Sequence, residues 1–246
     1  MLVTRLVAPL LSANCHVISD PSGRCVVVDP GAGATAQIRA LVAERGWTPL
    51  AVAVTHGHVD HSWAAGELAD GWGVPTLVHE DDAYRLRDPF GTLGPLGAQL
   101  VAMGDAAGLG PAPTVPARLS PFAAADGWVQ VELGDPADPF VLRGRHLPGH
   151  TQGSTVYLVD AAVAAPLGAP GATATAGVVG PVALTGDVLF AGSIGRSDLP
   201  GGDEATMARS LAWFREVDPG TLVLPGHGPA STIGAELARN PYLPRP

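Results

Sequence analysis

Short apolar runs, separated by turn residues, alternate with amphipathic stretches along the first ninety positions of the chain. Residues 25–29 form an apolar, β-branched run that meets a Pro-Gly pair, which predicts a buried strand closed by a turn. Apolar residues then recur at near-helical spacing over residues 36–42, and Gly46 follows as a C-cap, so a helix is predicted there. Residues 50–55 predict a second strand. This alternation is typical of an α/β fold.

The second half of the chain predicts further strands. Three short β-rich runs, at residues 128–133, 140–143 and 155–160, are expected in a second sheet. Two more apolar runs end at Leu184 and Leu224. A helix is expected between them, because Met207, Leu211 and Phe214 share one face and an acidic pair occupies the first turn.

Two segments lack this patterning. Residues 88–126 are rich in Pro, Gly and Ala, and two interpretations stay open: a lid or insert loop over the site, or a passive surface loop. Residues 161–181 are a low-complexity Ala/Gly/Pro/Thr segment, which cannot bury enough apolar surface to order itself and so predicts a flexible hairpin connection. Since the chain has no repeat and no dividing linker, we expect one domain over residues 1–246.

Composition and charge narrow the classes of partner. The 246 residues are 46% hydrophobic, which is enough to fill a sizeable core. The formal net charge is −9, and all 14 cationic residues are Arg, with no Lys in the chain. Without a basic stripe, a phosphate backbone has little to bind, so we expect no nucleic-acid partner.

The cysteines and the N-terminal segment bear on the compartment. Cys15 and Cys25 are too few for a disulfide framework and are expected to be buried thiols in a reducing compartment. The N-terminal residues lack the basic and apolar regions of a signal peptide, and no run approaches the ~20 apolar residues that a membrane span needs. We therefore expect a soluble, cytoplasmic protein that does not bind membranes.

A cluster of metal-binding residue types follows the second predicted strand. His56, His58, Asp60 and His61 lie within six residues, and neutral imidazole and carboxylate are the ligands of zinc and similar divalent ions. A strand or turn would send His56 and His58 the same way, while Asp60 and His61 turn toward a neighbouring position, which predicts two sites. An accidental surface cluster is disfavoured, because five of the eight histidines fall in this motif and in two later Gly-His turns.

Three further candidate ligands occur in similar local contexts. His150, Asp187 and His227 each follow an apolar run and a Gly turn, where the missing Cβ lets the backbone bend toward an ion. His146 has helical i,i+4 spacing to His150, but Pro148 and an adjacent Gly between them disfavour a helix. We therefore expect His146 to support a ligand or to lie on the surface.

The pattern His-x-His-x-Asp-His, followed by a separate His, Asp and His, resembles the metallo-β-lactamase superfamily, and all seven positions have a match. The resemblance implies a single-domain, four-layer αββα sandwich with the site at one edge of two packed sheets. It also implies two divalent metal ions, Zn²⁺ first with Fe or Mn as alternatives. His56, His58 and His150 would bind the first ion, Asp60, His61 and His227 the second, and Asp187 would bridge them.

Asp29 matches an acidic residue of this family that supports a ligand histidine and fixes its tautomer. The alternative is an ordinary turn Asp before Pro30.

Two metal ions about 3.5 Å apart can share a water and hold it as hydroxide for attack on a carbonyl. Asp60 is expected to orient this hydroxide as well as to bind metal. A covalent mechanism that uses Cys15 with His16 is disfavoured, because sequence neighbours rarely have the geometry of a nucleophile and base pair.

Residues 147–154 and 186–203 resemble the glyoxalase II-like branch of the superfamily, most of all in the stretch Gly-Arg-Ser-Asp-Leu-Pro-Gly-Gly that contains Arg196. The resemblance implies hydrolysis of a small-molecule thioester of the S-2-hydroxyacyl-thiol type. Full-length glyoxalase II has a C-terminal helical domain whose basic residues grip glutathione, and this chain has neither that length nor any Lys. We therefore expect the short bacterial form, with the carrier thiol left open. Arg196 is the nearest basic candidate for a substrate carboxylate; the alternative is pairing with Asp198.

Other activities stay open. A persulfide dioxygenase would use one iron on His56, His150 and Asp187, a facial set suited to oxygen chemistry. A lactonase or β-lactamase would use the same hydroxide on a cyclic ester or amide. A nuclease is disfavoured by the charge, and a non-catalytic binding module is disfavoured because seven His and Asp ligands on two ions leave room for water. The acyl group, the native metal and the oligomeric state are not determined by the sequence.

Overall fold

The computed structural model of the protein describes residues 1–109, 112–163 and 179–243. The N-terminal half contains six strands: β1 (Leu2–Val7), β2 (Asn14–Ser19), β3 (Arg24–Val28), β4 (Thr48–Ala53), β5 (Thr76–His79) and β6 (Leu119–Phe122). The strands β1, β2 and β3 are antiparallel, whereas β3 to β6 are parallel. The helices of this half are α1 (Thr35–Arg45), α2 (Val59–Ser62), α3 (Ala65–Trp72), α4 (Ala83–Arg87) and α5 (Pro95–Ala106), with short 3-10 turns η1 (Glu80–Asp82) and η2 (Gly91–Leu93).

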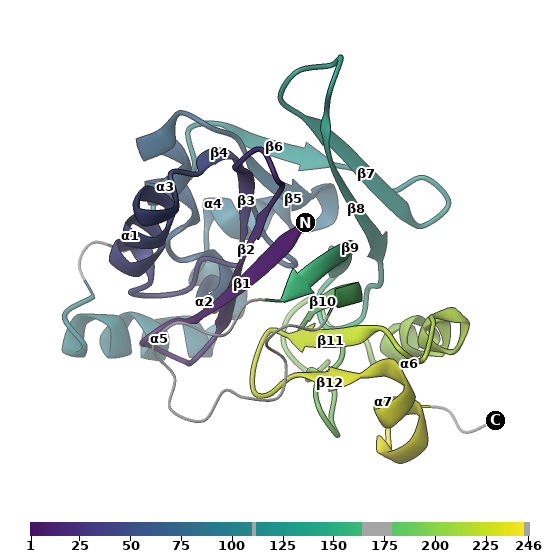
Figure 1. Ribbon diagram of the computed structural model, residues 1–246. Helices are drawn as coiled ribbons and strands as arrows, with labels where there is room; N and C mark the ends of the chain where they lie inside the picture. Colours follow the sequence, from purple (N-terminus) through teal and green to yellow (C-terminus); the bar gives the residue numbers. More distant parts are fainter. Residues whose placement is uncertain (110–111, 164–178, 244–246) are drawn as a thin grey trace.

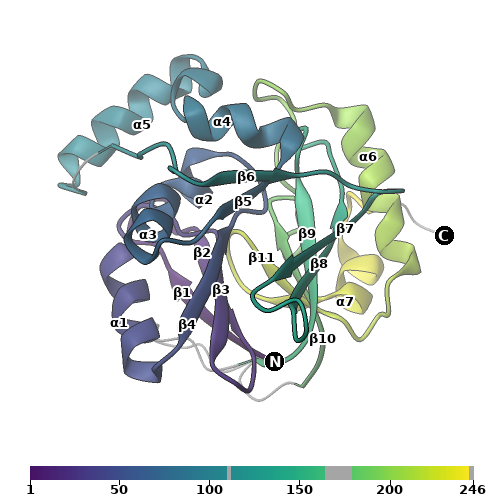
Figure 2. The same cartoon turned by 90° about the horizontal axis from the view of Figure 1, so that it is seen from above.

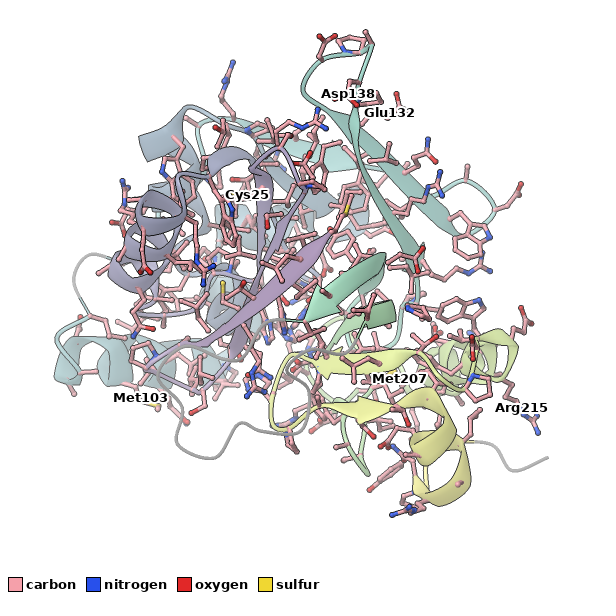
Figure 3. All side chains as sticks on the ribbon, in the orientation of Figure 1. Cys25, Met103, Glu132, Asp138, Met207 and Arg215 are labelled. Carbon is pink, nitrogen blue, oxygen red and sulfur yellow. The ribbon has the colours of Figure 1, made fainter. Side chains whose placement is uncertain are left out.

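The C-terminal half has the same layered plan. Its strands are β7 (Trp128–Leu133), β8 (Phe140–His146), β9 (Thr155–Val163), β10 (Val179–Gly186), β11 (Leu222–Pro225) and β12 (Ser231–Thr232). Its helices are α6 (Glu204–Ala212), η3 (Trp213–Glu216) and α7 (Ile233–Arg239). β7 to β10 are antiparallel, β10 and β11 are parallel, and Glu132 and Asp138 project into solvent on the β7–β8 hairpin (Figure 3).

The two halves are joined through β1 and β9, which pair in parallel, Leu2 with Ala162 and Val3 with Val163 among the described residues (Figure 1). The expected two sheets therefore form one hydrogen-bonded ladder folded on itself. One apolar core lies between the halves, a second lies under α1, α3 and α4, and a third lies under α6 and α7. Helices cover the outer faces on both sides (Figure 2), which confirms the predicted α/β sandwich with four layers.

Strand β3 illustrates how the sequence builds these layers. Val26 and Val28 face the core between the halves, while Cys25 and Val27 face the core under the helices. Successive side chains of a strand point to opposite faces, so a strand buried on both faces is a continuous apolar run. The predicted buried strand at residues 25–29 is confirmed, as is the helix ended by Gly46, whose φ of 62° is left-handed.

The prediction of irregular structure over residues 88–126 is wrong in part. Helix α5 and strand β6 both lie in this segment, and β6 extends the parallel sheet beyond β5. The glycines that suggested a loop are sites of close packing: a Cβ at Gly97 would lie 2.0 Å from the Phe90 carbonyl oxygen, and one at Gly104 would lie 2.5 Å from the Trp63 ring. Glycine is required at both positions of the helix, because a larger residue would clash with these neighbours.

The low-complexity segment 161–181 is described only at its ends. Residues 161–163 and 179–181 belong to β9 and β10, which pair antiparallel with Val179 opposite Ala162. The remaining residues, 164–178, lie outside the described residues, so the predicted flexible connection stays a prediction there. In the part of the chain that the structure describes, none of the helices has the length and apolar character that a bilayer crossing demands.

Candidate metal centre

The seven predicted ligands meet at one edge of the folded sheet. The turn after β4 carries His56 and His58, and the single helical turn of α2 that follows carries Asp60 and His61. His150 lies between β8 and β9, and Asp187 and His227 come directly after β10 and β11. A backbone hydrogen bond of 2.8 Å from Gly226 N to Gly186 O joins the last two turns. All seven side chains are therefore brought together by strand ends, where α/β folds place their sites.

The first group consists of His56, His58 and His150, whose ring nitrogens converge. His150 Nε2 lies 3.2 Å from His56 Nε2 and 2.9 Å from His58 Nδ1. His150 donates its Nδ1 proton to the Arg196 carbonyl oxygen at 2.7 Å. The Thr55 hydroxyl donates its only proton to Asp29 Oδ2. It therefore accepts a hydrogen bond from His56 Nδ1 at 3.1 Å. The two Nε2 atoms then face each other with lone pairs, an arrangement that a cation between them would stabilise.

The second group consists of Asp60, His61 and His227. His227 Nε2 lies 3.2 Å from both Asp60 Oδ2 and His61 Nε2. Asp187 touches both groups, with Oδ1 3.3 Å from His61 Nε2 and Oδ2 3.7 Å from the Nε2 atoms of His150 and His227. Asp187 Oδ1 is buried and has no hydrogen-bond partner among the described residues. These imidazole and carboxylate donors fit the binding of divalent cations.

The electrostatics around His56, His58 and Asp60 favour the charge states that metal binding requires. Burial and the neighbouring imidazole of His150 lower the pKa of His58 to about 3. Burial also lowers the pKa of His56, and the positive charge of His61 adds to this effect. Burial opposes ionisation of Asp60, but His61 and His227 outweigh it and hold the pKa of that carboxyl below its ordinary value. Neutral imidazoles and an ionised carboxylate are the ligand forms that bind divalent metals.

His61 differs from the other two imidazoles. Burial opposes its protonation, but Asp187, Asp60 and Asp29 outweigh burial and raise its pKa well above the ordinary value.

Asp29 supports His61 as predicted from its place at the end of β3. Its carboxylate accepts from His61 Nδ1 at 3.1 Å and from the backbone and hydroxyl of Thr55, both at 2.7 Å. The contact from Nδ1 leaves His61 Nε2 directed at Asp187 and His227. Asp29 is only 1% exposed, so its carboxylate serves these buried contacts rather than solvent.

A second supporting carboxylate, Asp82, was not among the residues predicted from the sequence. It is fully buried and accepts four hydrogen bonds: at Oδ2 from Gly57 N at 2.9 Å and Thr151 Oγ1 at 2.6 Å, and at Oδ1 from Gly153 N at 3.1 Å and Arg85 Nε at 3.2 Å. One carboxylate thus connects the loop of His56 and His58 to the loop of His150. No local signal separates Asp82 from Asp81, whose side chain is 52% exposed.

Other predicted residues are placed as follows. The side chain of Arg196 is 58% exposed and donates two hydrogen bonds of 2.6 Å to Asp198, the pairing expected as the alternative to substrate binding. Its contact with substrate stays a prediction. Cys15 is fully buried, and burial, together with Asp29, raises the pKa of its thiol well above the ordinary value. His146 stands apart from the seven ligands and stacks on His79 with ring centroids 3.8 Å apart.

A cavity of about 340 Å³ is lined by five of the seven side chains. These five are His58, Asp60, His150, Asp187 and His227, and leucines, Phe190 and Arg196 also line the cavity. A group of metal donors at the base of a small-molecule-sized cavity is the arrangement expected of a catalytic metal site.

The chain belongs to the metallo-β-lactamase superfamily, since the model of that family matches residues 8–227. Among similar proteins, an uncharacterised protein of Mycobacterium tuberculosis (strain ATCC 25618 / H37Rv) is 38% identical over 99% of this chain and 98% of its own length. The probable metallo-hydrolase YqgX of Bacillus subtilis is 32% identical, with 96% and 94% covered, and hydroxyacylglutathione hydrolase GloC of Haemophilus influenzae is 30% identical, with 94% and 92% covered. The protein is thus a metallo-hydrolase-type member of the superfamily.

Solved structures agree with this assignment of the fold. The crystal structure of BLEG-1, a B3 metallo-β-lactamase, matches with a TM-score of 0.72 at 27% identity and covers 98% of this chain and 99% of its own. TTHA1623 in a di-iron-bound form matches with a TM-score of 0.70 at 29% identity, with 97% and 99% covered. Both resemble this chain over nearly its whole length.

Proposed function

We propose that this protein is a binuclear metal-dependent hydrolase that cleaves a small-molecule thioester of the S-2-hydroxyacyl-thiol type. The observation that carries the proposal is the pair of three-residue donor groups that share Asp187 beneath one cavity. Similarity to a relative named hydroxyacylglutathione hydrolase supports the substrate class. The net charge of −9 and the absence of Lys support a small-molecule substrate over a nucleic acid.

Two bound divalent ions would supply an ionised water as the nucleophile and would polarise the thioester carbonyl. The protein's own part is to hold and orient. His56, His58 and His150 would hold one ion, Asp60, His61 and His227 the other, and Asp187 would contact both. Asp60 Oδ2 would also accept a hydrogen bond from the attacking water and aim it at the carbonyl carbon. Asp29 and the Arg196 carbonyl keep the Nδ1 protons of His61 and His150, which leaves each Nε2 free to bind metal.

Zn²⁺ is the proposed metal, with Fe or Mn as alternatives, because imidazole and carboxylate donors suit all three. A similar protein, TTHA1623, is described in a di-iron-bound form. Elemental analysis of the purified protein distinguishes these metals and gives the number of ions per chain.

The deciding experiment combines that analysis with thioester hydrolysis. S-D-lactoylglutathione and the S-D-lactoyl ester of an uncharged thiol are offered to the protein, and loss of thioester absorbance is followed with and without a chelator. Near two metal ions per chain, with cleavage of either ester that the chelator abolishes, would support the proposal. The variant Asp187→Asn, checked for folding by circular dichroism, should lose this activity.

Two results would overturn it. A single iron per chain without thioester loss would favour a persulfide dioxygenase on His56, His150 and Asp187, and oxygen uptake with glutathione persulfide would test that alternative. Faster cleavage of a chromogenic β-lactam or a homoserine lactone than of any thioester would favour a β-lactamase or lactonase, as the similarity to BLEG-1 allows.

A further inference from the structure

The sides of the cavity above the metal donors are apolar. They are formed by Leu11, Leu93, Leu96, Leu100, Phe190 and Leu199. Leu93 and Leu100 are buried in a small core with Trp63, while Leu11, Leu96 and Leu199 pack on that core and stay half-buried. The exposed parts of these leucines therefore face the space in which a substrate would lie.

Cationic groups are scarce on this surface. Among the described residues that line the cavity, Arg196 is the only Arg, and its guanidinium already donates two hydrogen bonds to Asp198. The other charged residues of the lining, Asp60 and Asp187, are acidic. Because the chain has no Lys, no lysine from another part of the sequence can reach over the cavity.

These features bear on the carrier thiol. Glutathione carries two carboxylates and one ammonium group, and a carboxylate placed against leucines loses hydration without gaining a partner. An uncharged hydrocarbon group gains free energy at the same surface, because its apolar area leaves water. The wall thus selects against a zwitterionic or polyanionic carrier.

We propose that the substrate's carrier thiol is uncharged and presents an apolar group to the wall of Leu93, Leu96 and Leu100. This inference rests on the proposed thioester hydrolase function and names its substrate class: S-2-hydroxyacyl esters of uncharged, apolar thiols. The acyl carbonyl lies over the metal donors, and the thiol's hydrocarbon lies along α5.

The test compares esters with one acyl group and different thiols. The S-D-lactoyl esters of ethanethiol, butanethiol and hexanethiol are assayed beside S-D-lactoylglutathione on the metal-loaded protein. We expect kcat/KM to rise by up to about fourfold per methylene until the cavity is filled. The hexanethiol ester should exceed the glutathione ester by at least about tenfold. A glutathione ester that is cleaved as well as or better than the hexanethiol ester overturns the inference.

A matched pair of variants locates the effect. Leu96 and Gln99 both lie on α5, and Leu96 lines the cavity whereas Gln99 is exposed to solvent. Leu96→Arg should lower kcat/KM for the hexanethiol ester by about tenfold or more and raise it for the glutathione ester. Gln99→Arg adds the same charge to the same helix and should leave both values unchanged. Equal effects of the two variants would contradict the assignment of the wall.

A binding measurement makes the inference independent of turnover. The S-acetonyl thioethers of hexanethiol and glutathione cannot be hydrolysed, and calorimetry gives their affinities for the folded, metal-loaded protein. The hexyl thioether should bind at least about tenfold more tightly, and Leu96→Arg should remove that preference. If no thioester is cleaved, the proposed function fails, while this measurement still decides whether the wall binds apolar thiol groups; tighter binding of the glutathione thioether overturns the inference alone.

Discussion

The Thr151 hydroxyl donates a hydrogen bond of 2.6 Å to Asp82 Oδ2, and the same oxygen accepts from the backbone N–H of Gly57. Thr151 follows the predicted ligand His150, and Gly57 separates His56 from His58. A single buried carboxylate therefore sets the distance between two loops that are 94 residues apart at His56 and His150.

Asp82→Asn should weaken both metal binding and folding. The Asn amide N–H₂ is a donor, and it would face groups that themselves donate to Asp82 in the unmodified protein. The substitution also leaves the buried Arg85 without its ion pair. We expect metal affinity to fall by about 10- to 100-fold, and the free energy of unfolding to fall by about 3 kcal/mol. Metal titration and urea unfolding measure the two effects. The control Asp81→Asn, at a side chain that is 52% exposed, should change stability by less than about 0.5 kcal/mol; equal effects of the two variants would rule out the positioning role.

The two donor groups should be separable by mutation. His58→Ala removes a donor from the first group only, and His227→Ala removes one from the second only. If each group holds one ion, either variant should retain about one metal per chain after dialysis, against about two for the unmodified protein. Elemental analysis measures the stoichiometry. A single ion that is lost entirely in His58→Ala and kept in His227→Ala would instead indicate a mononuclear centre.

His16 should make the fold sensitive to acid. Burial, with added repulsion from Arg5 and His61, lowers its pKa to about 3, below the ordinary value of 6.5. The unfolded chain therefore binds a proton that the folded chain excludes, so stability is lost as the pH falls below about 6.5. Between pH 7 and pH 5 this residue should cost about 2 kcal/mol of the free energy of unfolding. Urea unfolding at both pH values gives the loss of unfolding free energy between pH 7 and pH 5. This loss should be smaller by about 2 kcal/mol in His16→Gln than in the unmodified protein. An equal loss in the two proteins would refute the assignment.

Two helical glycines, Gly97 on α5 and Gly71 on α3, should differ in how substitution by alanine changes the free energy of unfolding. In Gly97→Ala the new Cβ would meet the Phe90 carbonyl oxygen at 2.0 Å, a backbone atom that cannot move freely. In Gly71→Ala on α3 the contact at 2.4 Å is the far end of the Arg39 side chain, which can swing away. We expect Gly97→Ala to lower the free energy of unfolding by about 1–3 kcal/mol. Gly71→Ala should be neutral or stabilising by up to about 1 kcal/mol. Urea unfolding of both variants checks the contrast, and destabilisation of similar size in the two would refute it.

The sequence by itself determined the strands β3, β4 and β7 to β11, the helices α1 and α6, and the seven metal-binding candidates. Each of these is a local signal: residues 25–29 are a continuous apolar run that meets a Pro-Gly pair, and His150, Asp187 and His227 each follow an apolar run and a Gly turn. Strand and turn geometry is set by neighbours a few residues away, so reading along the chain was enough to predict it.

Only the tertiary structure decided the rest. Gly97 suggests a loop in the sequence, but in the structure it lies in a helix packed against Phe90. Asp82 and Asp81 look alike in the sequence, and only the fold buries Asp82 and exposes Asp81. The cavity wall joins Leu11, Leu96 and Leu199, which no spacing connects. The burial of a side chain and the meeting of distant side chains at one site depend on contacts between residues far apart in sequence. Those contacts form only when the whole sheet has folded on itself.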